Sequence, residues 1–301
     1  MTVLDAIFQG VIQGLTEFLP ISSSGHLALY QHFTGKNVDN GLLFSVILHM
    51  GTLLAIFIIY RKTIKNLFLE IFSAIYDIFT GKFKENLKRP SRQLLIMLFI
   101  SCLPLLIIPV FKDGYEGLAA NPPLIFEGFC FLFTSLLLYL ADRCVKGKFQ
   151  LNNSDKLKDK NEFNINSKGN YKKAACVGLV QAILAPLPGV SRSGSTISSG
   201  LLLGFSRSFA VEYSFILGIP TILGGCIFEL SGALEELKTA NLLPIMIGFI
   251  VSAVIGCLSM KLVNWIVKND KFQPFILYTM ILGVLVILLG IYELVFGIIK
   301  F

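Results

Sequence analysis

The chain has 301 residues, of which 54% are hydrophobic and 15% are charged. Soluble domains carry about 25% charged residues, so this composition excludes a soluble protein and predicts an all-α polytopic membrane protein. The net charge of +7 does not indicate nucleic-acid binding, because 8 of the 26 basic residues lie in 61–92 and 9 lie in 143–173, between apolar segments. Basic clusters placed in this way mark the cytoplasmic loops of membrane proteins.

Six apolar segments are long enough to cross a hydrocarbon core of about 30 Å as helices. They are 42–60, 93–111, 122–141, 209–230, 241–265 and 273–299. With the basic loops in the cytoplasm, the first span runs inward, the next two run out and back, and the C-terminus lies outside. Loop 61–92 also contains an apolar stretch flanked by charge, which is expected to lie at the inner membrane surface. No Lys or Arg precedes Lys36, so the first segment is expected to remain in the mature protein.

Two further segments, 5–32 and 174–203, are apolar but are broken at the centre by proline, glycine and serine. Each half is too short to cross the bilayer, so we predict two re-entrant helix–loop–helix hairpins. Irregular backbone at membrane depth requires cover from protein or a water-filled cavity. The charge pattern makes the first hairpin enter from outside and the second from the cytoplasm, the orientation of an inverted repeat. The alternative is two ordinary kinked spans.

The two hairpins are similar in sequence. Residues 10–25 read GVIQGLTEFLPISSSG, and residues 178–194 read GLVQAILAPLPGVSRSG. They align at an offset of 168 that becomes 169 at the serines, and the offset of 169 continues where FSVILHMGTLL (44–54) falls on YSFILGIPTIL (213–223). A register held over some fifty residues predicts one site built between two related halves.

This repeat defines the expected organisation of the chain. We predict a single membrane domain, 1–301, with a first half of about 1–141 and a second half of about 174–301. A Lys/Asn-rich cytoplasmic connector at 143–173 would join the halves.

The first hairpin carries a carboxylate, hydroxyls and an imidazole within one turn of chain. An intramembrane charge costs roughly 2.5–3.5 kcal/mol on insertion scales, so Glu17 needs a functional reason. Glu17 and His26 are expected to meet across the loop and to form part of an acid–base or nucleophilic site. The alternative is that the serines only cap the second helix. The polar residues of this hairpin are Gln13, Glu17, Ser22, Ser23, Ser24 and His26.

The second hairpin carries an anion-binding pattern, PGVSRSGST at 188–196. Its glycines and serines expose backbone amides at a helix N-terminus, and Arg192 adds a guanidinium fork suited to phosphate oxygens. A structural arginine is the alternative. Because both charges are intramembrane, Glu17 and Arg192 are expected to pair when no ligand is bound. The predicted phosphate-binding residues are Gln13, Ser22, Ser24, Gly189, Ser191, Arg192, Ser193 and Thr196.

Other polar residues are weaker candidates. His49 lies inside a span, whereas Glu127, Glu212 and Glu229 are expected to be structural polar partners and His32 a surface residue. The six cysteines are scattered without a CxxC pair, which indicates small packing residues rather than a metal–thiolate site or a disulfide framework.

Two segments resemble the two signature motifs of the undecaprenyl-diphosphatase family of the bacitracin-resistance type. They are EFLPISSSGH (17–26), taken with Gln13, and PGVSRSGST (188–196). The similar layout covers essentially the whole chain. The resemblance implies an integral inner-membrane hydrolase that converts undecaprenyl diphosphate to undecaprenyl phosphate and inorganic phosphate. That reaction recycles the lipid carrier for cell-wall synthesis and confers bacitracin resistance. It also implies an outward-facing site and a divalent cation, magnesium or calcium.

The resemblance also implies residue roles. Glu17, Ser23 and His26 match functional positions of the first motif, and Glu17 is the candidate cation ligand. In the second motif Arg192 matches a catalytic position, and Ser191 and Thr196 match further functional positions. Gln13 stands where other members have Glu, which weakens schemes with two carboxylates on the cation. The attacking group is left open between Ser23, His26 and water.

Two other functions compete with this hypothesis. Inverted repeats with broken helices also build transporters, so a flippase of a lipid phosphate or a transporter of a small anion is the main alternative. A phosphatase of the phosphatidic-acid-phosphatase type is a second alternative. Two of its sequence motifs are matched, at Lys82 with Arg89 and at 24–26, but they occur in reversed order and a third motif is missing. The sequence leaves the oligomeric state open, and a homodimer is compatible with it.

Overall fold

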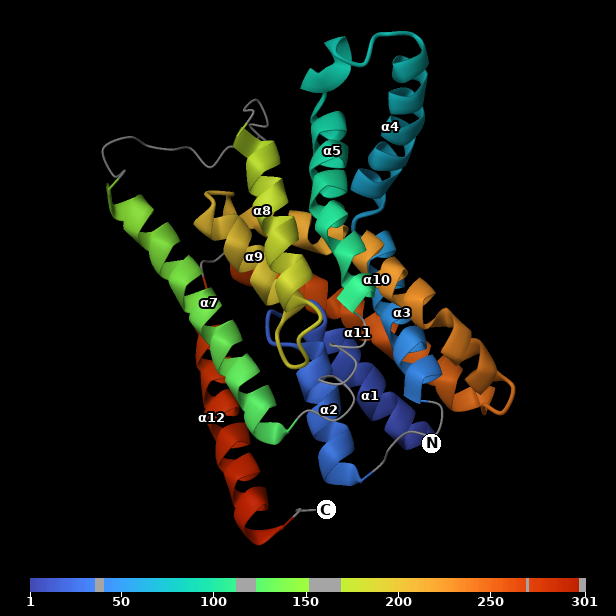
Figure 1. Ribbon diagram of the computed structural model, residues 1–301, viewed down its shortest axis with the longest axis vertical. Coiled ribbons are helices and arrows are strands. Elements are labelled where there is room, and N and C mark those ends of the chain that lie inside the picture. The colour runs from blue at the N-terminus through green and yellow to red at the C-terminus, as the bar shows by residue number, and fades with distance from the viewer. Residues whose placement is uncertain (36–40, 112–122, 152–168, 269–270, 298–301) are drawn as a thin grey trace.

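The computed structural model describes residues 1–35, 41–111, 123–151, 169–268 and 271–297, and in these ranges it contains helices and no strands (Figure 1). The helices are α1 (Val3–Thr16), α2 (Ser23–Thr34), α3 (Gly41–Ile59), α4 (Arg61–Phe79), η1 (Glu85–Lys88), α5 (Pro90–Cys102), η2 (Leu103–Phe111), α7 (Leu124–Leu151), α8 (Gly169–Leu184), α9 (Arg192–Leu202), α10 (Arg207–Leu237), α11 (Leu242–Lys268) and α12 (Gln273–Phe296).

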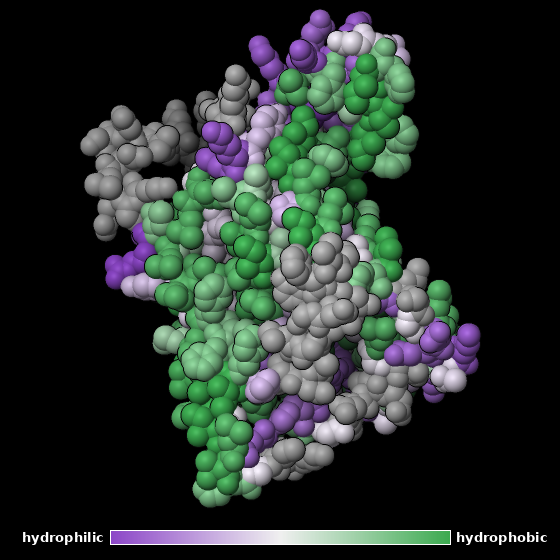
Figure 2. All heavy atoms as spheres, in the orientation of Figure 1, coloured by the Kyte–Doolittle hydropathy of each residue, from purple (hydrophilic) through white to green (hydrophobic). Residues whose placement is uncertain are grey.

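Six of the described helical segments are long and apolar enough to span a membrane. They are Gly41–Ile59, Pro90–Ile108, Leu124–Lys146, Arg207–Glu229, Leu242–Val267 and Gln273–Phe296. All six predicted spans are therefore confirmed, and with them the all-α polytopic class. Figure 2 shows apolar side chains over the flanks of the molecule and hydrophilic ones gathered at the tip of the α4–α5 turn.

Both predicted hairpins are present as helix–loop–helix units, α1 with α2 and α8 with α9. Their helices have 14, 12, 16 and 11 residues. At 1.5 Å per residue these helices are roughly 17–24 Å long, shorter than a hydrocarbon core of about 30 Å. The lengths suit re-entrant hairpins, and the re-entrant placement itself stays a prediction.

The second helix of each hairpin begins in the same way. Ser22 caps α2, its Oγ accepting a hydrogen bond from the Gly25 N–H at 3.3 Å. Ser191 caps α9 with a 3.0 Å bond from the Gly194 N–H. An N-cap serine is worth about 1 kcal/mol relative to alanine. The capping role considered for the serines of the first hairpin therefore holds for Ser22, and Ser191 has the same role in the second hairpin.

Matching glycines also allow the first helix of each hairpin to touch a span. A Cβ on Gly10 would lie 2.9 Å from the carbonyl oxygen of Gly248 in α11, and one on Gly178 would lie 2.5 Å from that of Ser101 in α5. Helix α1 thus packs on α11 as α8 packs on α5, while α3 meets α10 and α7 meets α12. These are the pairs that a two-fold relation between the halves predicts, and the division into halves remains a prediction that they support.

The predicted connector 143–173 is helical at both of its ends. Helix α7 continues to Leu151 and α8 begins at Gly169, so 143–151 and 169–173 are helical, and 152–168 lie outside the described residues. Charge marks where a helix leaves the bilayer rather than where it ends, and Lys146 continues α7 while pairing with Asp142 one turn earlier at 2.5 Å.

Helices α4 and α5 form a projection beside the other helices (Figure 1). A fully buried Arg92 joins them, donating hydrogen bonds to Glu70 at 2.6 Å and to Asp77 at 2.8 Å. The bond from Arg92 holds the pKa of Asp77 below its usual range. Phe72 and Phe79 leave an exposed apolar face on α4, and its expected place at the inner membrane surface stays a prediction.

Candidate active site

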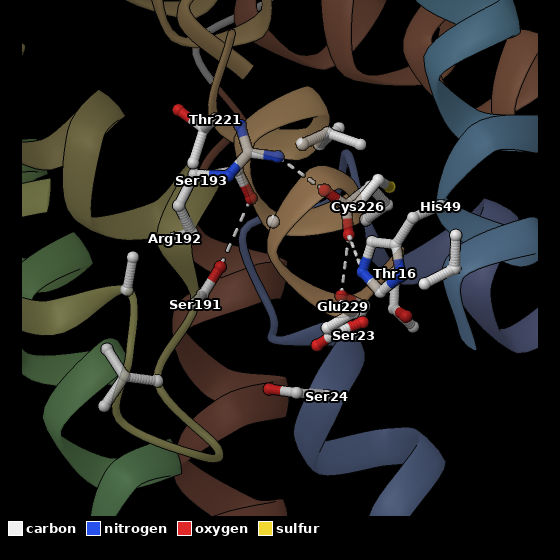
Figure 3. A pocket seen from close by; sticks show the side chains of 16 residues that line it. Thr16, Ser23, Ser24, His49, Ser191, Arg192, Ser193, Thr221, Cys226 and Glu229 are labelled. Atoms are coloured by element: carbon white, nitrogen blue, oxygen red, sulfur yellow. Dashed lines mark hydrogen bonds and ion pairs between the residues drawn. The ribbon is translucent and has the colours of Figure 1, made fainter. Parts of the chain in front are cut away.

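The loops of the two hairpins meet at a cavity of about 210 Å³ (Figure 3). The C-terminal end of α1, the N-termini of α2 and α9, the loop before α9, and helices α3 and α10 form its walls. The lining residues are Thr16, Glu17, Ser23, Ser24, Val46, His49, Ala185, Val190, Ser191, Arg192, Ser193, Thr221, Ile222, Gly225, Cys226 and Glu229.

An ion pair between the hairpins crosses one side of this cavity. The guanidinium of Arg192, at the start of α9, donates a hydrogen bond to Oε1 of Glu17 at 2.5 Å. The two side chains are only 14% and 7% exposed, so each depends on the other to offset the cost of burying its charge. The predicted pairing of these two intramembrane charges is confirmed.

The second oxygen of the same carboxylate holds two residues of its own hairpin. The Ser23 hydroxyl donates to Oε2 of Glu17 at 2.8 Å, and the Gln13 side-chain amide donates to it at 3.1 Å. Gln13 is fully buried and does not line the cavity. It therefore positions Glu17, whereas Ser23 presents a hydroxyl oxygen to the cavity in a fixed direction.

Two helix N-termini face the cavity, because Ser23 and Ser24 begin α2 and Arg192 and Ser193 begin α9. An α-helix N-terminus carries unsatisfied N–H groups and roughly half a positive charge, which favours an anion. The two ends and the Arg192 guanidinium thus offer an anion its donors, beside the carboxylates of Glu17 and Glu229.

The predicted backbone donors of 189–194 are only partly free. The Gly189 N–H bonds the Ser24 hydroxyl oxygen at 3.4 Å, and the Ser191 N–H bonds the Thr134 hydroxyl oxygen at 3.2 Å. The Gly194 N–H is used by the cap. No such bond engages the N–H groups of Arg192 and Ser193 in the described part of the chain, so these two amides remain for a ligand.

The two hairpin loops approach each other through glycines. Gly189 has a φ of +86°, which side-chain-bearing residues rarely adopt. A Cβ on Gly25 would lie 3.2 Å from the Gly189 Cα and 2.6 Å from the Phe131 ring. Gly189 therefore serves the geometry of the loop and orients Ser24 through its amide.

His26 does not contact Glu17, contrary to expectation. Its Nδ1 bonds the Ser22 carbonyl oxygen at 2.6 Å, and its Nε2 bonds the Tyr278 hydroxyl at 2.7 Å while the ring stacks on Tyr278. Helix α12 therefore holds this imidazole outside the cavity lining. Its catalytic role stays a prediction.

Two other predicted binding residues also lie behind the cavity wall. The Thr196 hydroxyl bonds the Ser214 hydroxyl of α10 at 2.6 Å and two carbonyls of its own helix. Ser22 is buried and caps α2 with an unusual φ of +74°. Both shape the hairpins in this arrangement, while Ser24, Ser191 and Ser193 reach the cavity as predicted.

Helices α3 and α10 contribute residues that sequence reasoning ranked low or missed. His49 lies 4.0 Å from Glu17, and Glu229 lines the same cavity instead of being only a structural partner. Gly218 was missed: a Cβ there would lie 2.6 Å from NH1 of Arg192, so its absence leaves room for the guanidinium. The internal repeat contains a signal for both His49 and Gly218, because these two residues align at the offset of 169.

The remaining weak candidates lie outside the cavity lining. Glu212 accepts a bond from the Thr63 hydroxyl at 3.1 Å, as expected of a structural partner. His32 pairs with Glu293 of α12 at 2.7 Å rather than facing free surface. The Oε2 atom of Glu127 is buried and has no hydrogen-bond partner within the described ranges. The six cysteines are free thiols.

The role of Glu17 as a ligand of a divalent cation stays a prediction. Both of its oxygens already accept hydrogen bonds, from Arg192 on one side and from Ser23 and Gln13 on the other. Among the residues whose positions are described, no group of three or more His, Cys, Asp or Glu side chains is placed to hold a metal ion. A cation in this cavity would therefore depend on ligand oxygens.

The fold and the cavity define a polytopic membrane protein with a polar cavity between two hairpins, walled by an acid, a guanidinium and several hydroxyls. Comparison with known proteins gives the family: the model of the family described as bacitracin resistance protein BacA matches residues 6–285, and the chain belongs to this family.

Similar relatives span nearly the whole chain. A protein of Methanosphaera stadtmanae named undecaprenyl-diphosphatase is 36% identical over 295 residues, covering 97% of this chain and 99% of its own. One of the same name from Alkaliphilus metalliredigens is 36% identical, covering 97% and 100%. Another of that name, from Acinetobacter baumannii, is 31% identical and covers 96% of each chain.

Proposed function

We propose that this protein hydrolyses undecaprenyl diphosphate to undecaprenyl phosphate and inorganic phosphate. The observation that carries the proposal is the Glu17–Arg192 pair, which joins the two hairpins at a cavity flanked by two helix N-termini. Family membership and the printed names of the relatives support the substrate.

The shape of the cavity suits a diphosphate headgroup. Pockets for whole small molecules usually measure about 300–1,000 Å³. A cavity of about 210 Å³ has room for a headgroup and not for a long polyprenyl chain, which would extend along the apolar flanks seen in Figure 2. Two helix N-termini on one cavity offer each phosphate its own set of amide donors.

The cavity supplies what phosphoryl transfer requires. Catalysis of this reaction is mostly positioning and stabilisation of negative charge, because the transferred group needs little covalent help. The guanidinium of Arg192 and the free amides of 192 and 193 stabilise the phosphate oxygens. Glu17 orients the Ser23 hydroxyl, and either this hydroxyl or a water held beside it attacks the terminal phosphorus.

Several finer features complete the proposal. The family resemblance leads us to propose a divalent cation, Mg²⁺ or Ca²⁺, held by oxygens of the bound substrate, where it would offset negative charge. We propose the cytoplasmic (inner) membrane as the location, with the cavity open to the outer face. A homodimer is part of the same proposal. The recycled lipid carrier would support cell-wall synthesis and bacitracin resistance.

A phosphate-release assay tests this function. Purified protein in detergent, without any membrane gradient, should release inorganic phosphate from undecaprenyl diphosphate, and a chelator should reduce the rate. Arg192→Ala should abolish release, whereas Arg143→Ala, which changes an exposed arginine of α7, should not. A transporter would release no phosphate under these conditions, and that result would refute the proposal.

A further inference from the structure

The imidazole of His49 faces the cavity, and one of its ring nitrogens takes part in no hydrogen bond within the described residues. Its side chain is 34% exposed, and its Nε2 lies 4.0 Å from Oε2 of Glu17 (Figure 3). Its Nδ1 lies 2.8 Å from the Ser45 carbonyl oxygen, which can only accept a hydrogen bond. Nδ1 therefore donates to this carbonyl, and Nε2 is the ring nitrogen directed toward the cavity.

The other imidazole near the hairpin is not available in this way. Both ring nitrogens of His26 are engaged, by the Ser22 carbonyl and the Tyr278 hydroxyl. Glu17 is also occupied, because Arg192, Ser23 and Gln13 all donate to its two oxygens. His49 is thus the cavity-lining imidazole whose Nε2 makes no hydrogen bond within the described residues and whose ring orientation is fixed by Ser45.

The internal repeat gives an independent reason to single out this position. His49 in α3 aligns with Gly218 in α10. Gly218 leaves the space in which the Arg192 guanidinium lies, since a Cβ there would be 2.6 Å from NH1. Matching positions on the two helices therefore both border the charged pair, and one brings an imidazole where the other makes room for the guanidinium.

The charged and titratable groups around His49 come from three elements. Glu17 approaches from the end of α1, Arg192 from α9, and Cys226 and Glu229 from α10. Helix α11 meets this part of α3 through Phe249 and Ser252, which surround Gly51 and carry no charge. The His49 imidazole thus faces two carboxylates and one guanidinium.

We propose that His49 is the proton acceptor of the hydrolysis proposed above, on which this inference rests. In the overall reaction the oxygen of one water bonds to the terminal phosphorus. The bond from that phosphorus to the bridging oxygen breaks, and its electron pair stays on the lipid phosphate. The attacking oxygen loses one proton, which Nε2 of His49 receives and then returns to the phosphate products or to solvent.

The test uses two variants of His49 in the full-length protein. His49→Asn places an amide nitrogen near Nδ1 and keeps the bond to Ser45, whereas His49→Gln places one near Nε2; neither side chain titrates. Each should lower kcat by roughly 100-fold, within the usual contribution of a general base, with a much smaller change in KM. The acid limb of the kcat–pH profile should disappear, and added imidazole should restore part of the rate.

His32→Gln is the matched control, because this histidine lies outside the cavity lining and pairs with Glu293. It should keep the acid limb and the rate. Size exclusion and thermal melting in detergent check that the variants fold. A measurement on the unaltered protein does not depend on them: the chain has three histidines, and inorganic phosphate should shift the ¹⁵N signals of His49 but not of His32.

The outcomes separate the two proposals. If the unaltered protein is active and its His49 variants keep the acid limb and a kcat within about twofold of the unaltered value, the role of His49 is overturned. The proposed function then still stands. The same holds for an active protein in which phosphate leaves the His49 signals unshifted. An unaltered protein that releases no phosphate from undecaprenyl diphosphate overturns the proposed function and this inference with it.

Discussion

The two hairpins are built by the same devices and equipped with different side chains. Ser22 and Ser191 cap the second helices alike, and Gly10 and Gly178 give the first helices the same close contact with a span. Facing the cavity, however, Ser23 of the first hairpin aligns with Arg192 of the second. Matching backbone thus carries a hydroxyl on one side and a guanidinium on the other.

The same contrast extends to other matched positions. Glu17 aligns with Ala185, and His49 aligns with Gly218. In both cases the second half has a small residue where the first half has a polar one. At Gly218 this leaves room for the Arg192 guanidinium, and at both positions the polar side chain belongs to the first half.

The largest effect should come from removing either side of the charged pair. Glu17→Gln and Arg192→Ala should each lower kcat/KM for phosphate release by at least ~10²–10³-fold, the usual cost of losing one donor that stabilises developing charge. Arg143→Ala, an exposed arginine on α7, should stay near the unaltered rate. Unchanged turnover in either pair variant would show that the two hairpins do not share a reactive site.

A smaller effect should follow from filling the space that the second half leaves open. Gly218→Ala adds a methyl group 2.6 Å from NH1 of Arg192 and should push the guanidinium aside. A misplacement of about 1 Å can cost 10²-fold, so we expect a loss of ~10–100-fold in kcat/KM. Gly224→Ala on the same helix meets nothing within 4 Å and is the matched control. Equal rates for both variants would contradict the packing argument.

The shared caps should differ in the strain they carry. Ser22 has a φ of +74°, whereas Ser191 has a φ of −74°. Glycine relieves roughly 1–2 kcal/mol of left-handed strain at Ser22 and costs a few tenths of a kcal/mol as a cap. Ser22→Gly should therefore raise the melting temperature in detergent slightly, and Ser191→Gly should lower it. Shifts of the melting temperature with the same sign in both variants would contradict this difference in backbone strain between the two caps.

The least effect on activity is expected in the α4–α5 projection, which lies outside the matched hairpins. Since Arg92 holds the pKa of Asp77 below its usual range, this contact contributes stability above the unfolded pKa of about 3.9 and loses it as pH falls through the lowered folded value. Asp77→Asn should remove this acid-dependent part of the melting curve and leave kcat near neutral pH unchanged. A large loss of kcat would tie the projection to the reaction.

Much of this architecture could be predicted from the sequence. Long apolar runs define the spans, and the repeat together with two intramembrane charges predicts the pairing of Glu17 with Arg192. The pattern could not show which imidazole faces the cavity. Span 42–60 places Ser45, His49 and Thr52 on one helix face, but this spacing does not say which neighbouring helix that face meets, and His49 was ranked below His26.

The position of His26 depends on contacts distant in the chain. Its neighbours in sequence place it close to Glu17, but Tyr278, 252 residues away, binds its Nε2. The placement of Thr196 behind the cavity wall also depends on a distant contact, because its hydroxyl reaches Ser214 only once α9 packs on α10. Such partners are set by tertiary packing, which spacing along one helix does not encode.

A double-mutant cycle on phosphate release from undecaprenyl diphosphate is the most direct test of the joint site. The rates of Glu17→Gln, Arg192→Gln and the double variant should show strong coupling, with the double variant hardly slower than the worse single one, because residues that act as a unit are not additive. Losses that simply multiply would mean that the two hairpins act independently and would contradict the account.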